Sequence, residues 1–193
     1  VSLTNTTLTE AVNYLRGKPG TSVSIWVERE NEDRWLHFTL ERSVIHLNSV
    51  TSSLLPGGIG YMRIRQFSQN TAQELRSHLE SLAAQNARSL ILDLSNNPGG
   101  LLVQAEKSAA LFLSEKTVFA ILGRNRRIED VRRTLPGAFW QKPMVVLINA
   151  GSASAAEILA GALKVHGRAL LMGETSFGKG SIQVIHEFED DSA

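Results

Sequence analysis

The sequence predicts an α/β protein in which helices cover a mostly parallel sheet. From about residue 59 onward, short apolar runs typical of buried strands alternate with amphipathic or alanine-rich segments typical of helices. With 193 residues, of which 42% are hydrophobic and 20% charged, the chain suits one full domain joined to a smaller piece. The sequence has neither an internal repeat nor a low-complexity segment that would indicate another architecture.

The first forty residues form a small α/β piece in this prediction. An amphipathic helix begins near Leu8 and is ended by the glycine- and proline-containing segment 17–20. Two alternating strands follow at 22–27 and 35–40. One short helix and two strands cannot bury a core alone, so we expect this piece to pack on something else or to belong to a larger domain.

A weakly structured link is expected from residue 43 to residue 60, with a turn signal at Pro56-Gly57-Gly58. The strong alternation of strands and helices comes after this turn. Strands are predicted at 59–64, 89–94, 117–122, 143–148, 168–172 and 181–188, and helices at 72–84, 101–113 and 153–165.

The composition excludes several classes of function. A net charge of +1, from 20 basic and 19 acidic residues, argues against general nucleic-acid binding, which needs a basic footprint. Without cysteine, the chain has no disulfide, no thiol nucleophile and no zinc–cysteine or iron–sulfur site. The longest uncharged stretch, 43–62, is interrupted by polar residues and is not a membrane span. The opening on Val1 without a signal peptide suggests a mature or excised piece.

Candidate functional residues gather where strands end and helices begin, which is where open α/β sheets bind ligands. In the junction 93–100, the glycines at 99 and 100 free the backbone to aim N–H groups at a ligand, although a plain loop would look the same. In the junction 149–157, Ser154 opens a helix, where free N–H groups and the helix dipole suit a nucleophile. The alternative for Ser154 is a capping box with Glu157.

The third junction, 173–180, nearly spells a phosphate-binding loop. Gly180 replaces the Ser or Thr that would bind magnesium, and a strand rather than a helix follows, so the pattern argues against nucleotide binding. Lys179 is either a surface lysine on a turn or a base, because a neutral lysine can take a serine proton directly.

A histidine base is the main alternative to the lysine. His166 lies twelve residues beyond Ser154 on the same predicted helix. At 1.5 Å per residue this is about 18 Å, which is too far for proton transfer. His186 is the only plausible base by proximity in sequence, and no supporting motif surrounds it.

Taken together, these junctions resemble one family, the C-terminal processing peptidases, also called tail-specific proteases. The matching stretches occur in the family's order within roughly residues 46–193. They are 60–64, 93–101, 152–158, 167–169 and 176–183. The resemblance implies an α/β core of crotonase/Clp-protease type, built from repeated ββα and βαβ units.

The resemblance also implies roles for individual residues. Ser154 would be the nucleophile of a serine endopeptidase, Lys179, 25 positions later, its general base, and Gln183, four residues further on, the group that orients the lysine. The backbone N–H groups implied for the oxyanion hole are those of Ala155 and of the double glycine, Gly100 rather than Gly99. The implied reaction cleaves protein substrates near their C-termini through an acyl-enzyme and needs no cofactor or metal.

By the same resemblance, residues 1–45 look like the C-terminal half of a PDZ domain, and residues 46–193 like a peptidase core cut short at its C-terminal end. Family members usually work outside the cytoplasm, so the bacterial periplasm or cell envelope is the expected location. The implied partners are protein or peptide substrates with accessible C-termini, and the resemblance leaves room for a homo-oligomer or an activating partner. Neither nucleic acid nor a membrane span is expected.

Two positions depart from the family's usual pattern. Ser95 stands where an arginine usually precedes the asparagine pair, and Val165 stands where an aspartate usually lies near the end of the nucleophile's helix. Losing these charges would weaken the order of the site. The departures motivate a second hypothesis, a peptide-binding scaffold on a catalytically impaired core, and a Ser-His hydrolase using His186 is a third.

Overall fold

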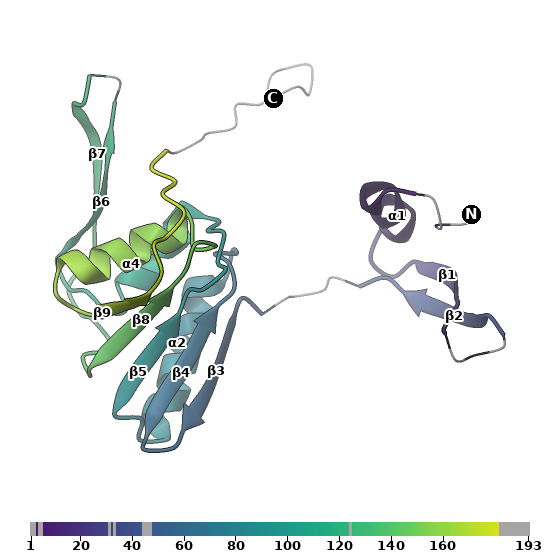
Figure 1. Ribbon diagram of the computed structural model, residues 1–193, viewed down its shortest axis with the longest axis horizontal. Helices are drawn as coiled ribbons and strands as arrows, with labels where there is room; N and C mark the ends of the chain where they lie inside the picture. Colours follow the sequence, from purple (N-terminus) through teal and green to yellow (C-terminus); the bar gives the residue numbers. More distant parts are fainter. Residues whose placement is uncertain are drawn as a thin grey trace. The chain divides into compact units, whose positions relative to one another are not determined.

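The computed structural model describes residues 3, 6–30, 32, 34–43, 48–123 and 125–181. The chain divides into two compact units, Val1–Leu47 and Asn48–Ala193, and each is described here by itself (Figure 1). Apart from its first residue, the strand predicted at 181–188 lies outside the described residues, and so do Gln183 and His186.

The first unit contains the three predicted elements. Helix α1 (Leu8–Leu15) begins after Thr7, whose backbone N–H donates to the Glu10 carboxylate at 2.8 Å while its hydroxyl accepts from the Glu10 N–H. Strands β1 (Ser22–Val27) and β2 (Leu36–Glu41) pair antiparallel. None of the described residues of this unit is buried, which agrees with the expectation that it builds no core alone.

The second unit is built on a five-stranded sheet with the strand order β3-β4-β5-β8-β9. The strands are β3 (Val50–Leu55), β4 (Ile59–Ile64), β5 (Ser89–Asp93), β8 (Met144–Ile148) and β9 (Leu170–Gly173). Strands β4, β5, β8 and β9 are parallel, and β3 pairs antiparallel with β4. The carboxyl ends of the four parallel strands therefore lie at the same edge of the sheet, and the loops that follow them can meet there.

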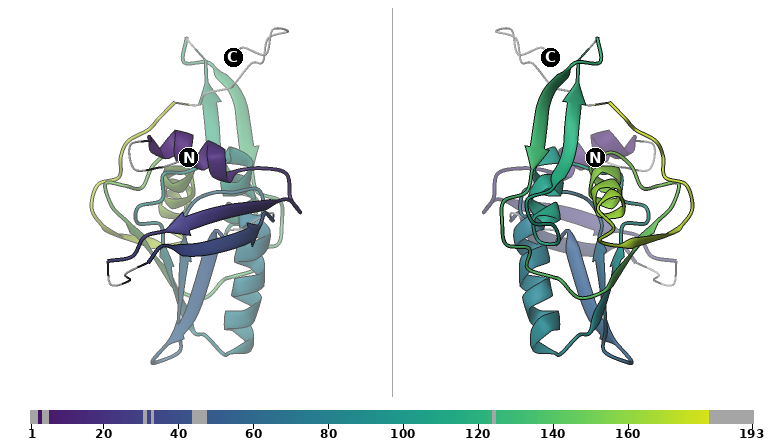
Figure 2. Two further views of the ribbon diagram at one scale, coloured as in Figure 1. Left: turned by 90° about the vertical axis from the view of Figure 1, so that its right-hand side faces the viewer. Right: turned by 90° about the vertical axis from the view of Figure 1, so that its left-hand side faces the viewer.

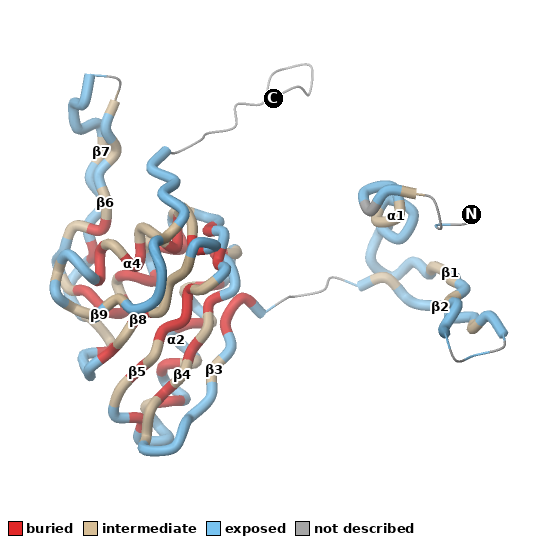
Figure 3. The backbone as a smooth tube through the Cα atoms, in the orientation of Figure 1, coloured by how far each residue is buried: buried red, intermediate tan, exposed pale blue. Residues whose placement is uncertain are grey.

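Helices α2 (Thr71–Ala84), α3 (Leu102–Ala109) and α4 (Ala155–Val165) complete the core (Figure 2). Burial alternates along β4, where Gly60, Met62 and Ile64 are buried and the residues between them are half-buried. The sequence predicted a sheet with helices over both faces, and along β4 this holds only for the face that carries Gly60, Met62 and Ile64. Buried residues gather on the sheet and helices of this unit (Figure 3). The fully buried side chains include Leu75, Leu79 and Leu82 of α2, Leu90 and Leu92 of β5, and Leu159 and Leu163 of α4.

Three details of the prediction were wrong. The expected link 43–60 contains strand β3, an edge strand that the sequence hides because half of its residues are polar and its last three residues are exposed. Strand 117–122 does not join the parallel sheet. It is β6 (Thr117–Leu122) of a separate antiparallel hairpin with β7 (Ile128–Arg133), a highly charged strand that was not predicted. Helix α3 ends at Ala109 and not at residue 113.

Candidate active site

Ser154 lies in the tight turn between β8 and α4, immediately before the first residue of the helix. Its backbone has φ 53° and ψ −116°, a left-handed conformation that is costly for a residue with a side chain. Such strain persists only where the surrounding structure enforces it, and it is frequent at active sites. The position also places Ser154 at the positive end of the α4 dipole.

The double-glycine loop packs directly against this turn. A Cβ on Gly99 would lie 2.8 Å from the Ser154 Cβ and 2.8 Å from the carbonyl oxygen of Ala153, so only glycine fits. The N–H of Gly99 donates to the Asn97 Oδ1 at 2.9 Å. Within the described part of the chain, the N–H groups of Gly100 and Ala155 donate to no other group. Both remain available to a ligand next to Ser154.

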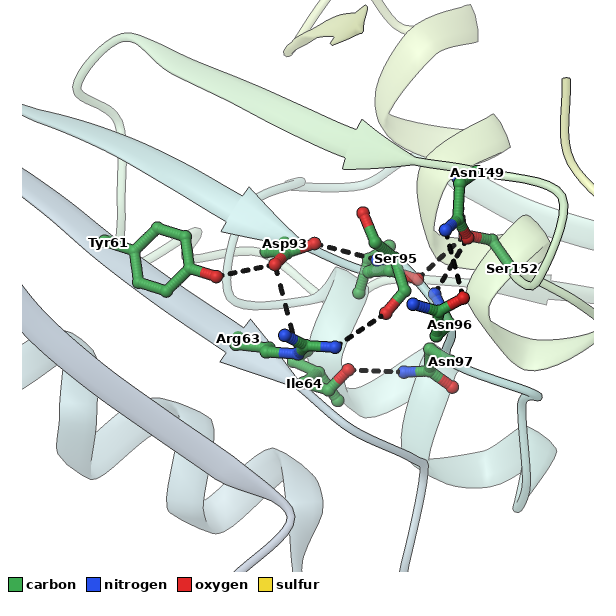
Figure 4. Close-up of polar contacts among 10 residues, drawn as sticks. Tyr61, Arg63, Ile64, Asp93, Ser95, Asn96, Asn97, Asn149 and Ser152 are labelled. Carbon is green, nitrogen blue, oxygen red and sulfur yellow. Dashed lines mark hydrogen bonds and ion pairs between the residues drawn. The ribbon is translucent and has the colours of Figure 1, made fainter. Parts of the chain in front are cut away.

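Asparagine side chains join the two loops (Figure 4). Asn149 donates from Nδ2 to the Asn96 Oδ1 at 3.0 Å and accepts the Asn96 N–H at 2.8 Å. Ser152, fully buried, donates its hydroxyl to the Leu94 carbonyl at 2.8 Å. The Ala153 N–H donates to the Asn97 carbonyl at 2.9 Å. These bonds fix the position of the double-glycine loop relative to the serine turn.

A charged cluster supports the start of the same loop on the outer face of the sheet (Figure 4). Asp93 accepts the Tyr61 hydroxyl at 2.6 Å and the Ser95 N–H at 2.8 Å, and the Arg63 Nε lies 3.9 Å from its carboxylate. Partial burial alone would raise the pKa of Asp93, but these hydrogen bonds and the guanidinium outweigh it and lower that pKa. Partial burial and the bond to Asp93 raise the pKa of Tyr61.

Glu157, in the first turn of α4, connects the serine turn to the loop that carries Lys179. Its Oε2 accepts the N–H groups of Ser154 at 2.8 Å and Lys179 at 2.9 Å. Its Oε1 accepts the Ser176 hydroxyl and the Gly178 N–H, both at 2.7 Å. Partial burial favours a higher pKa for Glu157, but the four donors outweigh this effect and hold its pKa below the ordinary value of 4.5.

Ser154 and Lys179 line one cavity of about 400 Å³, together with Gly100. The other walls are mostly apolar and come from α3, α4 and β6. Their residues include Leu102, Ile158, Phe119 and Ala120. A few polar groups in a mostly apolar, preformed cavity are the usual arrangement of a small binding or active site.

The geometry agrees with what the comparisons with known proteins show. The sequence model of peptidase family S41 matches residues 58–193, which is more than half of the chain. The chain belongs to peptidase family S41. The S41 match therefore covers the four parallel strands β4, β5, β8 and β9, helices α2, α3 and α4, and all three loops described above.

Relatives with curated names agree with the S41 assignment. The carboxyl-terminal-processing protease of Synechocystis sp. is 42% identical over 187 residues, covering 95% of this chain and 44% of the relative. Carboxy-terminal processing protease CtpA of Bacillus subtilis is 38% identical over 184 residues, covering 95% and 39%. A solved structure of a photosystem II D1 C-terminal processing protease superposes with a TM-score of 0.68 at 29% identity, covering 95% of this chain and 51% of that one. The chain spans less than half the length of these two curated relatives.

The S41 fold brings together most of the residues that the sequence singled out. Ser154, Lys179 and Gly100 line one cavity, Gly99 and Ala155 adjoin Ser154, and the Glu157 half of the predicted capping box is confirmed. His166 lies at the other end of α4, with its Nε2 2.7 Å from the Thr117 carbonyl. Among the described residues, no helix is long and apolar enough to cross a membrane.

The sequence reasoning missed the residues that hold the S41 site together. Asn149 follows β8 and Asn96 follows β5, and because the two strands are parallel neighbours, their shared edge could have predicted this pair. At the two departures from the family pattern, the Ser95 carbonyl accepts from the Arg63 Nη2 at 3.3 Å, and Val165 is 80% exposed at the end of α4.

Proposed function

We propose that this S41 protein is a serine endopeptidase that cleaves protein substrates near their C-termini through an acyl-enzyme on Ser154. The observation that carries the proposal is the shared cavity, in which a strained serine at a helix N-terminus, a lysine and the Gly100 backbone face the same space. Lys179 acts as the general base, and Gln183 orients it. The N–H groups of Gly100 and Ala155 form the oxyanion hole, and Gly99 does not contribute because its N–H is held by Asn97.

In the proposed reaction, the Ser154 oxygen attacks the scissile carbonyl carbon while its proton moves to the neutral amine of Lys179. The carbonyl oxygen takes the negative charge and accepts from the two backbone N–H groups. When the intermediate collapses, the amine product leaves with the proton from Lys179, and an ester to Ser154 remains. Water then attacks this ester, passing one proton through Lys179 back to the serine oxygen and releasing the carboxylic acid product.

The experiment is a set of single substitutions in the full-length protein, assayed on an unstructured polypeptide with a free C-terminus. Ser154→Ala and Lys179→Ala should each lower kcat by about 10⁴-fold or more, because the two groups act as a unit. Ser181→Ala is a matched control, since Ser181 lines the same cavity without a proposed role, and it should remain near wild type. The Ser-Lys assignment would be contradicted if the Lys179→Ala variant still cleaved the substrate. It would also be contradicted if the single substitution His186→Ala abolished cleavage.

We further propose that the first unit is the second half of a PDZ domain that binds the substrate's C-terminus, and that the protein works outside the cytoplasm. Similar proteins include the bacterial processing proteases named above and carboxyl-terminal-processing peptidase 3, chloroplastic, of Arabidopsis thaliana, which fits such a location. Fusion to a reporter that is active only outside the cytoplasm tests the location. Deletion of residues 1–45 from the full-length protein should raise KM for tailed substrates more than it changes kcat.

A further inference from the structure

The β6–β7 hairpin extends beyond the body of the second unit as a two-stranded arm (Figures 1 and 2). It belongs to neither the five-stranded sheet nor the catalytic loops, and most of its described residues are exposed (Figure 3). A two-stranded hairpin is marginally stable alone, so a protruding one needs support from its base or from a partner. Its base is supported by the Arg133 guanidinium, which donates to the Thr117 hydroxyl at 3.2 Å and the Glu115 carbonyl at 3.1 Å.

One face of the arm is apolar and exposed. Ala120 lies opposite Val131, and Leu122 lies opposite Ile128 in the hairpin register. Ala120 and Leu122 are alternate residues of β6, and direct cross-strand partners share a face. The hairpin register shifts between Ile121 and Leu122, so Val131 and Ile128, three residues apart on β7, are the partners of these two residues and complete one surface, called here the apolar stripe. Leu122 is 57% exposed, Ile128 65% and Val131 41%. Aliphatic side chains gathered in this way on a protruding element mark an interaction surface.

The arm is also the basic part of an otherwise acidic chain. Segment 116–133 has six basic and two acidic residues, a net charge of +4, whereas the whole chain has a net charge of +1, so the remainder sums to −3. Asp130 is paired with Arg132 at 2.7 Å within β7. Arg126 and Arg127, both exposed in the turn, form no ion pair with the described residues. The end of the arm therefore presents unneutralised positive charge beside the apolar stripe.

The apolar stripe is continuous with the proposed active site. Ala120 belongs to the stripe and also lines the cavity that contains Ser154 and Lys179. From Ala120 to Leu122 the strand extends two residues, about 7 Å at 3.3–3.4 Å per residue. An extended peptide bound in the cavity would therefore need only two or three more residues to cover the stripe and bring the next residues to the basic turn.

We propose that the β6–β7 arm is a second docking site for the substrate, selecting extended polypeptides with apolar residues followed by acidic residues a few positions away from the scissile bond. The inference rests on the proposed function, since it places this segment beside the peptide cleaved at Ser154. Continuity with the cavity favours a substrate over a bilayer or a second copy of the chain, neither of which would need Ala120 in the cavity wall. Charge complementarity to the arm, which together with Lys116 has a net charge of +4, selects acidic residues.

The test compares three peptides on the full-length protein. The first is a short fluorogenic peptide that fills only the cavity. The other two extend it on either flank by a pair of apolar residues, followed by two aspartates in one version and by two lysines in the other. When the extension is on one of the two flanks, wild type should cleave the aspartate version with a kcat/KM about tenfold above that of the lysine version. The difference should come mainly from a lower KM for the aspartate version. R126E/R127E should abolish or reverse this preference. L122S/I128S should lower kcat/KM of both extended peptides about tenfold and leave the short peptide unchanged.

Two controls lie outside the apolar stripe and the basic turn of the arm. Leu135→Ser removes an aliphatic side chain that is 78% exposed, and Arg88→Glu reverses an exposed charge just before β5, at the opposite edge of the sheet from the site. Both should behave as wild type with all three peptides. Equal preferences in wild type and R126E/R127E, with the short peptide cleaved normally, would overturn this inference alone. If wild type does not cleave even the short peptide, the proposed function fails and the inference fails with it.

The other occupants of the arm give different results. The arm would be assigned to a membrane surface by two results together. Wild type would sediment with phosphatidylglycerol vesicles while L122S/I128S would not, and both double variants would show the same peptide preferences as wild type. A change of sedimentation mass in L122S/I128S with unchanged preferences would assign it to a contact between copies. Either result would contradict the substrate-docking proposal.

Discussion

Glu157 provides the sharpest test of how the serine turn and the lysine loop are held in register. Its two carboxylate oxygens accept four donors, two on each oxygen, from Ser154, Ser176, Gly178 and Lys179. Glutamine has nearly the same shape but one acceptor oxygen. The arrangement that loses least keeps the oxygen facing Ser154 and Lys179 and turns the NH₂ toward Ser176, whose hydroxyl can accept instead of donating. Only the bond from the Gly178 N–H is then lost outright.

The expected size of the effect follows from counting these bonds. Each is worth about 1 kcal/mol for a partly exposed group, so Glu157→Gln should cost 1–2 kcal/mol of loop positioning, about a 5- to 30-fold loss of kcat. Glu157→Ala removes all four bonds, about 4 kcal/mol, and should lower kcat about a thousandfold. KM should change little because Glu157 holds the loops and does not line the cavity.

The assay is steady-state cleavage of a short fluorogenic peptide by the full-length variants, with thermal unfolding recorded in parallel. Glu174→Gln is the matched control, because Glu174 lies in the same loop and its exposed side chain takes no part in the network. A Glu157→Ala variant that stays folded with kcat within threefold of wild type would refute the idea that this carboxylate aligns Ser154 and Lys179.

Three further predictions follow from the site and the core. Gly99→Ala should lower kcat at least a hundredfold with a smaller effect on the melting temperature, because the added Cβ meets Ser154 and φ is +100° there; wild-type kcat would contradict this packing. The stability that Glu157 confers is present above its ordinary pKa of 4.5 and is lost as pH falls through its lowered native pKa. Urea titrations of wild type and Glu157→Gln should therefore show a difference in unfolding free energy that is constant from pH 7 to pH 5 and becomes smaller only below pH 4.5. If this difference were already lost at pH 5, the lowered pKa of Glu157 would be contradicted. Leu79→Ala, in the fully buried face of α2, should lower the free energy of unfolding by 2–5 kcal/mol in urea titration, and a loss under 1 kcal/mol would show that the core is not packed as described.

Local sequence signals were sufficient for the elements that bury one face. The helix 72–84 was predicted to within a residue or so because its apolar residues repeat with the helical period, and the strands 59–64, 89–94 and 143–148 because each is a short, mostly apolar run. Strands β3 and β7 were missed for the opposite reason, since most of their residues are exposed, at least half are polar, and their partners are decided by tertiary context.

The site was predictable in its chemistry but not in its support. Ser154 and Lys179 came from loop position and resemblance. The roles of Asn149, Ser152 and Arg63 depend on which loops meet at one edge of the sheet, and a linear sequence does not contain that information until the strand order is known. Glu157 was recognised only as a cap, because its three contacts with the lysine loop span 19 to 22 residues.

Trapping the acyl-enzyme tests the central claim most directly. The full-length protein is mixed with a small activated ester that fits the cavity, quenched in acid, and analysed by intact mass and peptide mapping. The account predicts one acyl group on Ser154, formed rapidly in wild type, at least a thousandfold more slowly in Lys179→Ala, and absent in Ser154→Ala. An acyl group on another residue, or equal acylation rates in wild type and Lys179→Ala, would contradict it.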